Sequence, residues 1–177
     1  MRKPRDLEKN VWYAVGTGLN IGEPLFQLPI AVVLLYRVLR EAKKRFGFEL
    51  RGLKIEGARL TFYIKPDDGL ELPLIMQWMK QTFSARFNWL TGRSGHVWGD
   101  RYESEILEGE PPGWAKAVDW EAVNVEADKP IPADTTYTLT GAISFSGRLG
   151  GKDEVADRGT PETALLFGFK RQHIAEP

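Results

Sequence analysis

Few side chains in this chain could do covalent or metal chemistry. The chain has no cysteine and two histidines, His96 and His173, which excludes thiol catalysis, cysteine-bound metals and a histidine cluster for zinc. Counting does not exclude a Ser-His-Asp triad, but His96 has no nucleophile elbow near it, and we expect it to be a turn residue. Glycine patterns at 16–22 and 146–153 depart from the dinucleotide and phosphate-loop motifs in spacing or in key residues.

Cationic and aromatic side chains suited to nucleic acid gather between residues 79 and 102. Cations can follow a phosphate backbone, and aromatic rings can stack on bases. The candidates are Lys80, Arg86, Arg93 and Arg101, with Trp98 and Tyr102 as stacking residues. A place in the core is the alternative for Trp98, because a tryptophan beside a strand is commonly buried. Arg37, Arg40 and Lys44 recur three and four residues apart, so they share one helical face that is either solvated or a further contact surface.

Charge and hydropathy favour a folded protein in water. The 177 residues hold 24 Lys/Arg and 24 Asp/Glu, but residues 1–107 carry 17 against 12 and residues 108–177 carry 7 against 12. A basic first part is a mild indication of a polyanionic partner. The longest apolar run, 30–36, is far short of the roughly 20 residues that cross a bilayer, and the basic N-terminus has no apolar segment after it. We expect a soluble, cytoplasmic protein without a secretory signal or a membrane partner.

Hydrophobic periodicity predicts the elements that position these residues. We expect a strand over 10–19, a helix from Pro29 to about Gly47, strands over 48–56 and 58–65, and a helix that opens at Pro73 and breaks at 92–95. An extended segment over 96–107 and a short helix over 114–127 follow, then a β-prone stretch over 135–145 and an isolated turn over 165–169. This order indicates an antiparallel α+β sandwich with helices on one face. We divide the chain into a domain over 1–110, a short helix within 111–130, and an acidic, glycine-rich, partly ordered extension over 131–177.

Motif order and spacing over about residues 8–110 resemble a known family. The stretches are Trp12-Tyr13-Ala14-Val15, Met79-Lys80-Gln81-Thr82-Phe83, Arg86-Phe87-Asn88, and a glycine-rich turn followed by Val97-Trp98-Gly99-Asp100-Arg101-Tyr102. They resemble the single-tyrosine, HUH-type transposases, which include the REP-associated and "IS two hundred" groups. The resemblance implies a ferredoxin-like fold, binding of single-stranded DNA hairpin ends, strand transfer in DNA transposition with Mg²⁺ or Mn²⁺, and a homodimer.

The positions that carry catalysis in that family hold other residues here. The family's paired metal-binding histidines, counted back from Pro66, correspond to Arg59 and Thr61. An arginine is permanently cationic and repels a metal, and a threonine hydroxyl is a weak ligand. The family's nucleophilic tyrosine belongs on the helix after the last strand, and 114–127 contains no tyrosine. The resemblance therefore implies a degenerate active site without catalytic residues or a metal cofactor.

We accordingly expect a transposase-like protein that binds single-stranded DNA but does not cleave it. Arg59 is either a replacement for the metal's charge or a strand arginine paired with a carboxylate such as Glu56. Tyr102 matches a family position where phenylalanine is also accepted, which favours packing or stacking. Two alternatives stay open. One is an active enzyme with a rearranged site that uses Tyr63 or Tyr102 and carboxylates such as Glu103 or Glu105, and the other is a protein-interaction or dimerisation module without catalysis.

Overall fold

The computed structural model describes residues 7–20, 24–68, 71–99 and 101–131, together with the backbones of two strands, 134–139 and 143–148. In chain order, the elements are β1 (Tyr13–Gly18), the 3-10 turn η1 (Leu25–Gln27), α1 (Pro29–Phe46), β2 (Phe48–Glu56), β3 (Arg59–Pro66), α2 (Leu72–Thr91), β4 (Glu103–Ile106), α3 (Trp120–Asp128), β5 (Asp134–Leu139) and β6 (Ile143–Arg148). The predicted order of strand, helix, strand, strand, helix, strand and helix is found in β1, α1, β2, β3, α2, β4 and α3. The isolated turn predicted over 165–169 lies outside the described residues.

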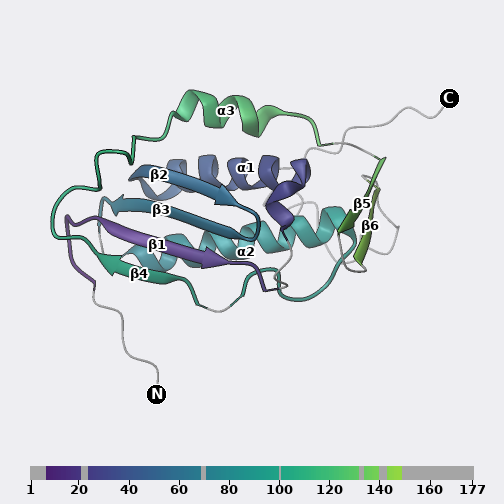
Figure 1. Ribbon diagram of the computed structural model, residues 1–177, viewed down its shortest axis with the longest axis horizontal. Helices are drawn as coiled ribbons and strands as arrows, with labels where there is room; N and C mark the ends of the chain where they lie inside the picture. Colours follow the sequence, from purple (N-terminus) through teal and green to yellow (C-terminus); the bar gives the residue numbers. More distant parts are fainter. Residues whose placement is uncertain are drawn as a thin grey trace, which may run out of the picture.

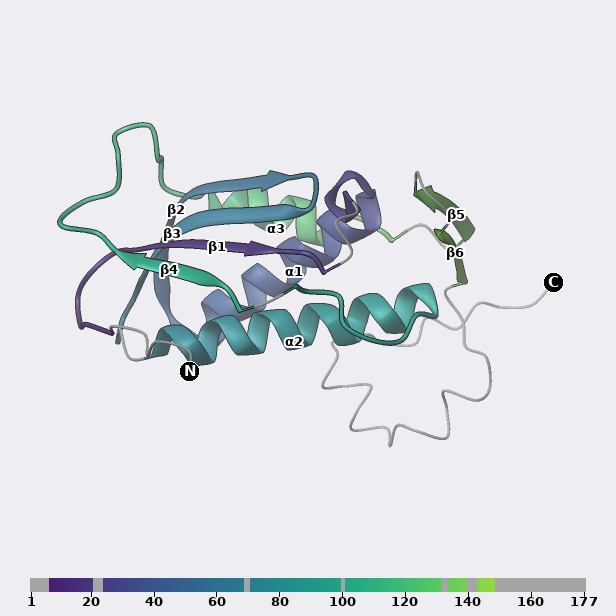
Figure 2. The same cartoon turned by 60° about the horizontal axis from the view of Figure 1, so that its bottom comes forward.

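The first four strands form one antiparallel sheet in the order β2-β3-β1-β4. Helices α1 and α2 lie side by side against one face of this sheet, and the other face has no helix over it among the described residues (Figures 1 and 2). The predicted α+β, ferredoxin-like architecture is therefore confirmed. The remaining strands, β5 and β6, pair with each other in a second sheet of two strands; they overlap the β-prone stretch predicted over 135–145, and β6 continues beyond it to Arg148.

Alternation along the central strands separates a buried face from an open one. On β3, Leu60, Phe62 and Ile64 are buried under the helices, whereas the residues between them are at least partly accessible. Tyr13 and Val15 of β1 are buried in the same layer. This period of two is the one that the sequence shows, because successive side chains of a strand point to opposite faces. The open face of the sheet is thus specified by the same residues that build the core.

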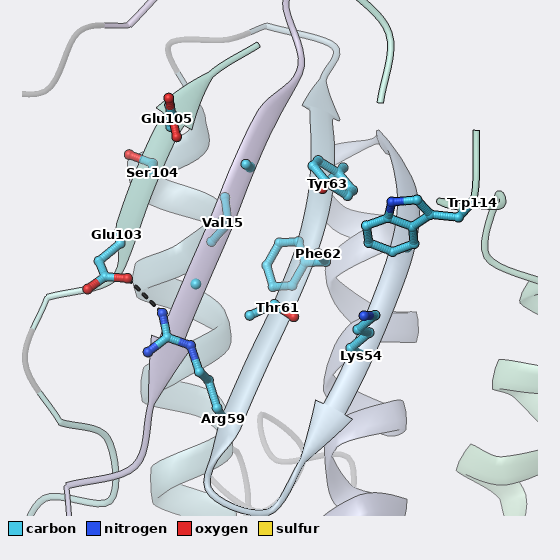
Figure 3. A pocket seen from close by; sticks show the side chains of 13 residues that line it. Val15, Lys54, Arg59, Thr61, Phe62, Tyr63, Glu103, Ser104, Glu105 and Trp114 are labelled. Atoms are coloured by element: carbon cyan, nitrogen blue, oxygen red, sulfur yellow. Dashed lines mark hydrogen bonds and ion pairs between the residues drawn. The ribbon is translucent and has the colours of Figure 1, made fainter. Parts of the chain in front are cut away.

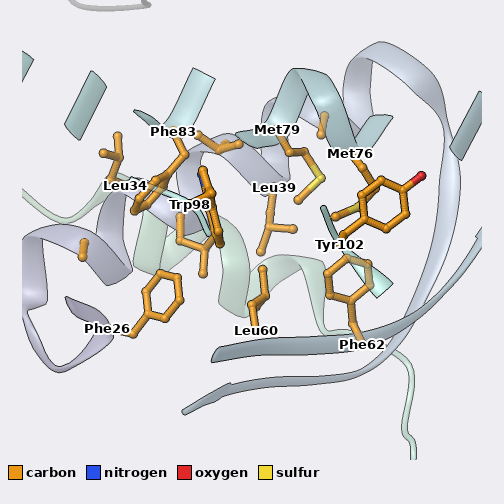
Figure 4. Packing of buried hydrophobic residues seen from close by; sticks show 14 of the residues in the cluster. Phe26, Leu34, Leu39, Leu60, Phe62, Met76, Met79, Phe83, Trp98 and Tyr102 are labelled. Carbon is orange, nitrogen blue, oxygen red and sulfur yellow. The ribbon is translucent and has the colours of Figure 1, made fainter. Parts of the chain in front are cut away.

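The core lies between the sheet and the two helices, and it takes in the segment that leads to β4. Trp98 packs against Phe26 and Phe83 with ring centroids 6.0 and 5.2 Å apart. Its indole Nε1 donates a hydrogen bond to the carbonyl oxygen of Lys80 at 3.0 Å. Figure 4 shows the ring of Tyr102 beside Met76 and Phe62 in the same cluster. The aromatic residues of the 92–102 segment therefore attach it to α2.

The segment before α3 corrects one prediction, since the helix begins at Trp120 and not at Trp114. Residues 115–118 instead run antiparallel along the outer edge of β2. The amide of Gly52 donates to the carbonyl oxygen of Lys116, and the amide of Val118 donates to that of Leu50, at 2.9 and 3.0 Å. Extended backbone on this edge satisfies groups that an edge strand would otherwise leave unpaired.

Helix α3 packs against α1 through Val123 and Ala127, both buried. The side chain of Asp119 caps its N-terminus by accepting hydrogen bonds from the next amides of the helix. At its C-terminus, Arg37 donates to the carbonyl oxygens of Ala127 and Lys129, and Arg40 pairs with Asp128 at 2.6 Å. Cations at a helix C-terminus interact favourably with its dipole. Two of the three basic residues on one face of α1 are thus used to hold α3.

Candidate nucleic-acid interface on the open sheet face

A shallow cavity of about 460 Å³ lies on the open face of the sheet. We call it the open-face cavity, and its outward-facing residues are Ala14 and Gly16 of β1, Lys54 of β2, Arg59, Thr61 and Tyr63 of β3, Glu103 and Glu105 of β4, and Trp114. Figure 3 shows the carboxylates on one side, the β3 side chains on the other, and Lys54 and Trp114 beyond them. The central strand contributes at most a methyl group to this face, so it forms a low floor between higher walls.

Strand register sets the composition of the walls. Ala14 pairs with Glu105 on one side and with Tyr63 on the other, and Gly16 pairs in the same way with Glu103 and Thr61. Neighbouring strands are about 4.8 Å apart, so the acidic wall on β4 and the wall on β3 stand about 10 Å apart. The register therefore builds a trough with carboxylates on one side and hydroxyl and aromatic groups on the other.

Arg59 closes one end of this trough. Its Nη2 donates a hydrogen bond to Oε2 of Glu103 at 2.7 Å, across β1 and over Gly16. A Cβ added at Gly16 would lie 2.9 Å from that Nη2, so the absence of a side chain there gives the guanidinium its path. Both side chains remain largely accessible, at 56% and 77%. The sequence had suggested Glu56 as the partner, and although Glu56 is opposite Arg59 in the register, the ion pair forms with Glu103.

The positive and negative charges of the open-face cavity balance. Two cations, Lys54 and Arg59, face two carboxylates, Glu103 and Glu105. Net charge alone therefore does not attract an anionic ligand. To bind the guanidinium of Arg59, such a ligand would have to replace the carboxylate of Glu103. An exposed ion pair contributes only about 0.2–1 kcal/mol, so such an exchange is accessible.

An aromatic group stands at the other end. Trp114 is 56% exposed and meets Tyr63 edge to face with ring centroids 5.8 Å apart. The ammonium of Lys54 lies 4.6 Å from the centroid of the same indole. The absence of a side chain at Gly52 lets Ala115 and the Tyr63 ring lie this close to β2. A Cβ at Gly52 would lie 2.9 Å from the Cβ of Ala115 and 3.0 Å from the Tyr63 ring. Trp114 is not among the contact residues predicted from the sequence, which placed it in a short helix over 114–127.

Arg59 and Thr61, the positions that the resemblance assigned to metal ligands, lie two residues apart on the open face of β3. Within the described residues, no group of three or more His, Cys, Asp or Glu side chains is placed to hold a metal ion. The donor set at this place consists of a guanidinium, a hydroxyl and a carboxylate already engaged by the guanidinium. These residues do not fit a divalent cation.

Three of the predicted contact residues lie in the core: for Trp98 and Tyr102 this is the packing alternative that the sequence offered, and for Arg86 it corrects the prediction. Arg86 is 2% exposed, and its Nη1 and Nη2 donate to the two carboxylate oxygens of Glu41 at 2.8 and 2.7 Å. Trp98 and Tyr102 are each 7% exposed. A phosphate cannot reach the Arg86 guanidinium, and a base cannot stack on either ring, without opening the core.

The other predicted cations are accessible but do not gather around Arg59. Lys80 is half-buried on α2, with its ammonium 5.8 Å from the Trp98 ring centroid, and Arg93 is half-buried just after that helix. Arg101 is exposed and lies two residues before Glu103. Of the predicted set, Arg59 alone lines the open-face cavity.

The candidate nucleophiles divide in the same way. Tyr102 is buried in the core, whereas Tyr63 lies on the open face, level with Glu105 across Ala14. Helix α3 contains no tyrosine and packs on α1, which is on the helical side of the domain (Figures 1 and 2).

Comparison with known proteins gives one likeness of fold. No protein-family model matches the chain, and no curated protein matches it in sequence. The structure is similar to a solved structure described as a REP-associated tyrosine transposase bound to a REP hairpin, with a TM-score of 0.51 and 13% identity. The match covers 62% of this chain and 64% of that one. The domain therefore has a transposase-like α+β fold. None of the helices in the described ranges is both long enough and apolar enough to span a bilayer.

Proposed function

We propose that this protein is a transposase-like DNA-binding protein that binds single-stranded or hairpin DNA on the open face of its sheet and does not cleave it. The observation that carries the proposal is the position of Arg59. A permanent cation lines the cavity at the place where the resemblance puts the metal site. A guanidinium can donate two hydrogen bonds to one phosphate, so it can replace the charge of a metal in binding while offering no activation to a nucleophile.

Two further features support this function. The solved structure with the similar fold is of a transposase bound to a REP hairpin. In the part of the chain that the structure describes, no helix covers the sheet face around Arg59, so this face is open to a single strand of DNA. Localisation in the cytoplasm and assembly as a homodimer remain part of the proposal.

A salt titration with a hairpin that carries a single-stranded flank tests DNA binding. Phosphate contacts release counterions, so the logarithm of the association constant should fall linearly with the logarithm of the salt concentration. Arg59→Gln should weaken binding and reduce the slope by about one contact. Arg45→Gln is the matched control, because Arg45 is an exposed arginine on α1, on the helical side. A flat, salt-independent response of the wild-type protein would contradict the proposal and favour an interaction or dimerisation module.

An active enzyme with a rearranged site is the second candidate, and one observation favours it. Tyr63 and Glu105 face each other across Ala14 on the open face, so a phenol and a carboxylate are present on the same surface. Incubation with labelled hairpin DNA and Mn²⁺, followed by denaturing electrophoresis, separates the two functions. A covalent protein–DNA adduct that disappears in Tyr63→Phe would establish cleavage and overturn the inactive assignment.

A further inference from the structure

We infer that the open-face cavity holds one unstacked nucleobase of a bound single strand, with Trp114 and Tyr63 as the stacking surface and the residues of the two walls as hydrogen-bonding partners. The inference rests on the proposed DNA binding and names the part of the strand that this site takes. It concerns a different set of contacts from the phosphate contact of Arg59.

The first argument is shape. Ala14 and Gly16 put no more than one methyl group on the centre of this face, between walls about 10 Å apart. A ribose-phosphate backbone needs no such depression, because it can follow a flat charged surface. A depression of about 460 Å³ in the middle of the sheet face instead accommodates a flat nucleobase that turns away from the backbone of the nucleic acid.

The second argument is the aromatic surface. Trp114 is exposed, yet it is held in place by Tyr63 and by the backbone pairing of 115–118 with β2, so a positioned aromatic ring stands at the edge of the cavity. Aromatic side chains that carry little conformational freedom are effective platforms for bases in single strands. Lys54, beside the same indole, is placed to meet the phosphate that accompanies the stacked base.

The third argument is the balance of donors and acceptors. The formal charge of the cavity is zero, and beside Arg59 and Lys54, which are assigned to phosphates, it offers the carboxylate acceptors of Glu103 and Glu105 and the hydroxyl groups of Thr61 and Tyr63. A second phosphate would face the carboxylates of Glu103 and Glu105 unfavourably. The edge of a neutral base, which carries both donors and acceptors, complements such a set. Charge and chemistry therefore favour a base over a phosphate at the centre of the trough.

The test is a scan of abasic sites along a single-stranded decanucleotide, measured at constant salt with wild type, Trp114→Ala and Trp114→Phe. One abasic position should lower the affinity of the wild type by about 5- to 100-fold, the range of a lost base–aromatic stack. Trp114→Ala should bind the intact strand more weakly by a similar factor and lose its sensitivity to that position, and in a separate salt titration of the intact strand its slope should equal that of the wild type. Trp114→Phe should restore much of the affinity, because a flat ring returns.

Two controls make the outcomes distinct. Ala14→Ile should abolish the abasic effect by filling the floor, and Trp89→Ala should leave it intact, since Trp89 is an exposed tryptophan on α2, away from the cavity. A salt-dependent wild type with a flat abasic scan, or with unchanged affinity in Trp114→Ala, would overturn the base site and leave DNA binding standing. A wild type that binds no single strand would overturn both.

Discussion

Nη2 of Arg59 and Oε2 of Glu103 meet at 2.7 Å, although 44 residues separate them in the chain and a whole strand lies between them in the sheet. The contact ties β3 to β4 over Gly16 and places a carboxylate where a bound phosphate would otherwise meet the guanidinium. Glu103 would thus compete with a bound phosphate for Arg59, and substitution of Glu103 measures how strongly it does so.

Glu103→Gln should raise the affinity for single-stranded DNA. The substitution removes a negative charge from the cavity and weakens the hold on Arg59, so we expect a gain of about 2- to 10-fold that shrinks at high salt. Thermal unfolding should change little, because exposed ion pairs contribute about 0.2–1 kcal/mol. Glu49→Gln, an exposed carboxylate on β2 outside the cavity, is the control. Equal effects of the two substitutions would show that only overall charge matters.

The ion pair between the buried Arg86 and the half-buried Glu41 should be essential for stability. Replacing Glu41 with leucine leaves the guanidinium charge inside the core, where we expect a loss of about 3 kcal/mol in the free energy of unfolding. Urea denaturation measures this loss. The double variant Glu41→Leu/Arg86→Met should be more stable than Glu41→Leu alone, because it removes both charges. A double variant at least as unstable as the single one would mean that packing, and not charge burial, sets the cost.

Gly52 should tolerate alanine less well than Gly92. Both have positive φ angles, 57° and 67°, so each substitution costs about 1 kcal/mol in backbone strain. At Gly52 the new Cβ would also meet Ala115 and Tyr63, whereas nothing lies within 4 Å at Gly92. Gly52→Ala should therefore lose clearly more stability than Gly92→Ala in urea denaturation. Adding Ala115→Gly should recover part of the difference, and no recovery would place the cost in the backbone alone.

Asp128 should make the attachment of α3 dependent on pH. The hydrogen bond and charge of Arg40 hold the pKa of Asp128 below its ordinary value. A lowered folded-state pKa gives stability that is present above the unfolded value of about 4 and is lost as the pH falls through the folded value. The free energy of unfolding of Asp128→Asn should be lower than that of the wild type at pH 7, and the two values should converge at about pH 2. NMR titration of the carboxyl carbon checks the pKa directly, and an ordinary value would refute this account.

Local patterns predicted the elements well because their physical causes are local. Pro29 starts α1 at its first residue, Gly47 follows its end, and the alternation around Phe62 identifies the buried face of β3. The start of α3 was wrong because the competing structure, pairing with β2, is made by residues more than sixty positions earlier. Periodicity in a single segment carries no information about such a partner.

The candidate site was less predictable for the same reason. Arg59 could be proposed from its position before Pro66, but its partner Glu103 depends on the order of strands in the sheet. Arg86 belongs to the motif, yet it lies on the core side of α2, where its guanidinium donates hydrogen bonds to Glu41 of α1. A cation among apolar residues at helical spacing is a signal that could have been used, since a buried arginine needs a partner of opposite charge.

A central strand with alanine and glycine on one side gives up the cross-strand contacts that β-branched side chains would make there. Selection for thermostability alone would be expected to enlarge positions 14 and 16, and each added methyl group would make the trough shallower. Natural sequences commonly stay below their attainable stability where activity requires it. Heat resistance and ligand capacity should therefore trade against each other along this one strand, and a library varied at these two positions would display the exchange directly.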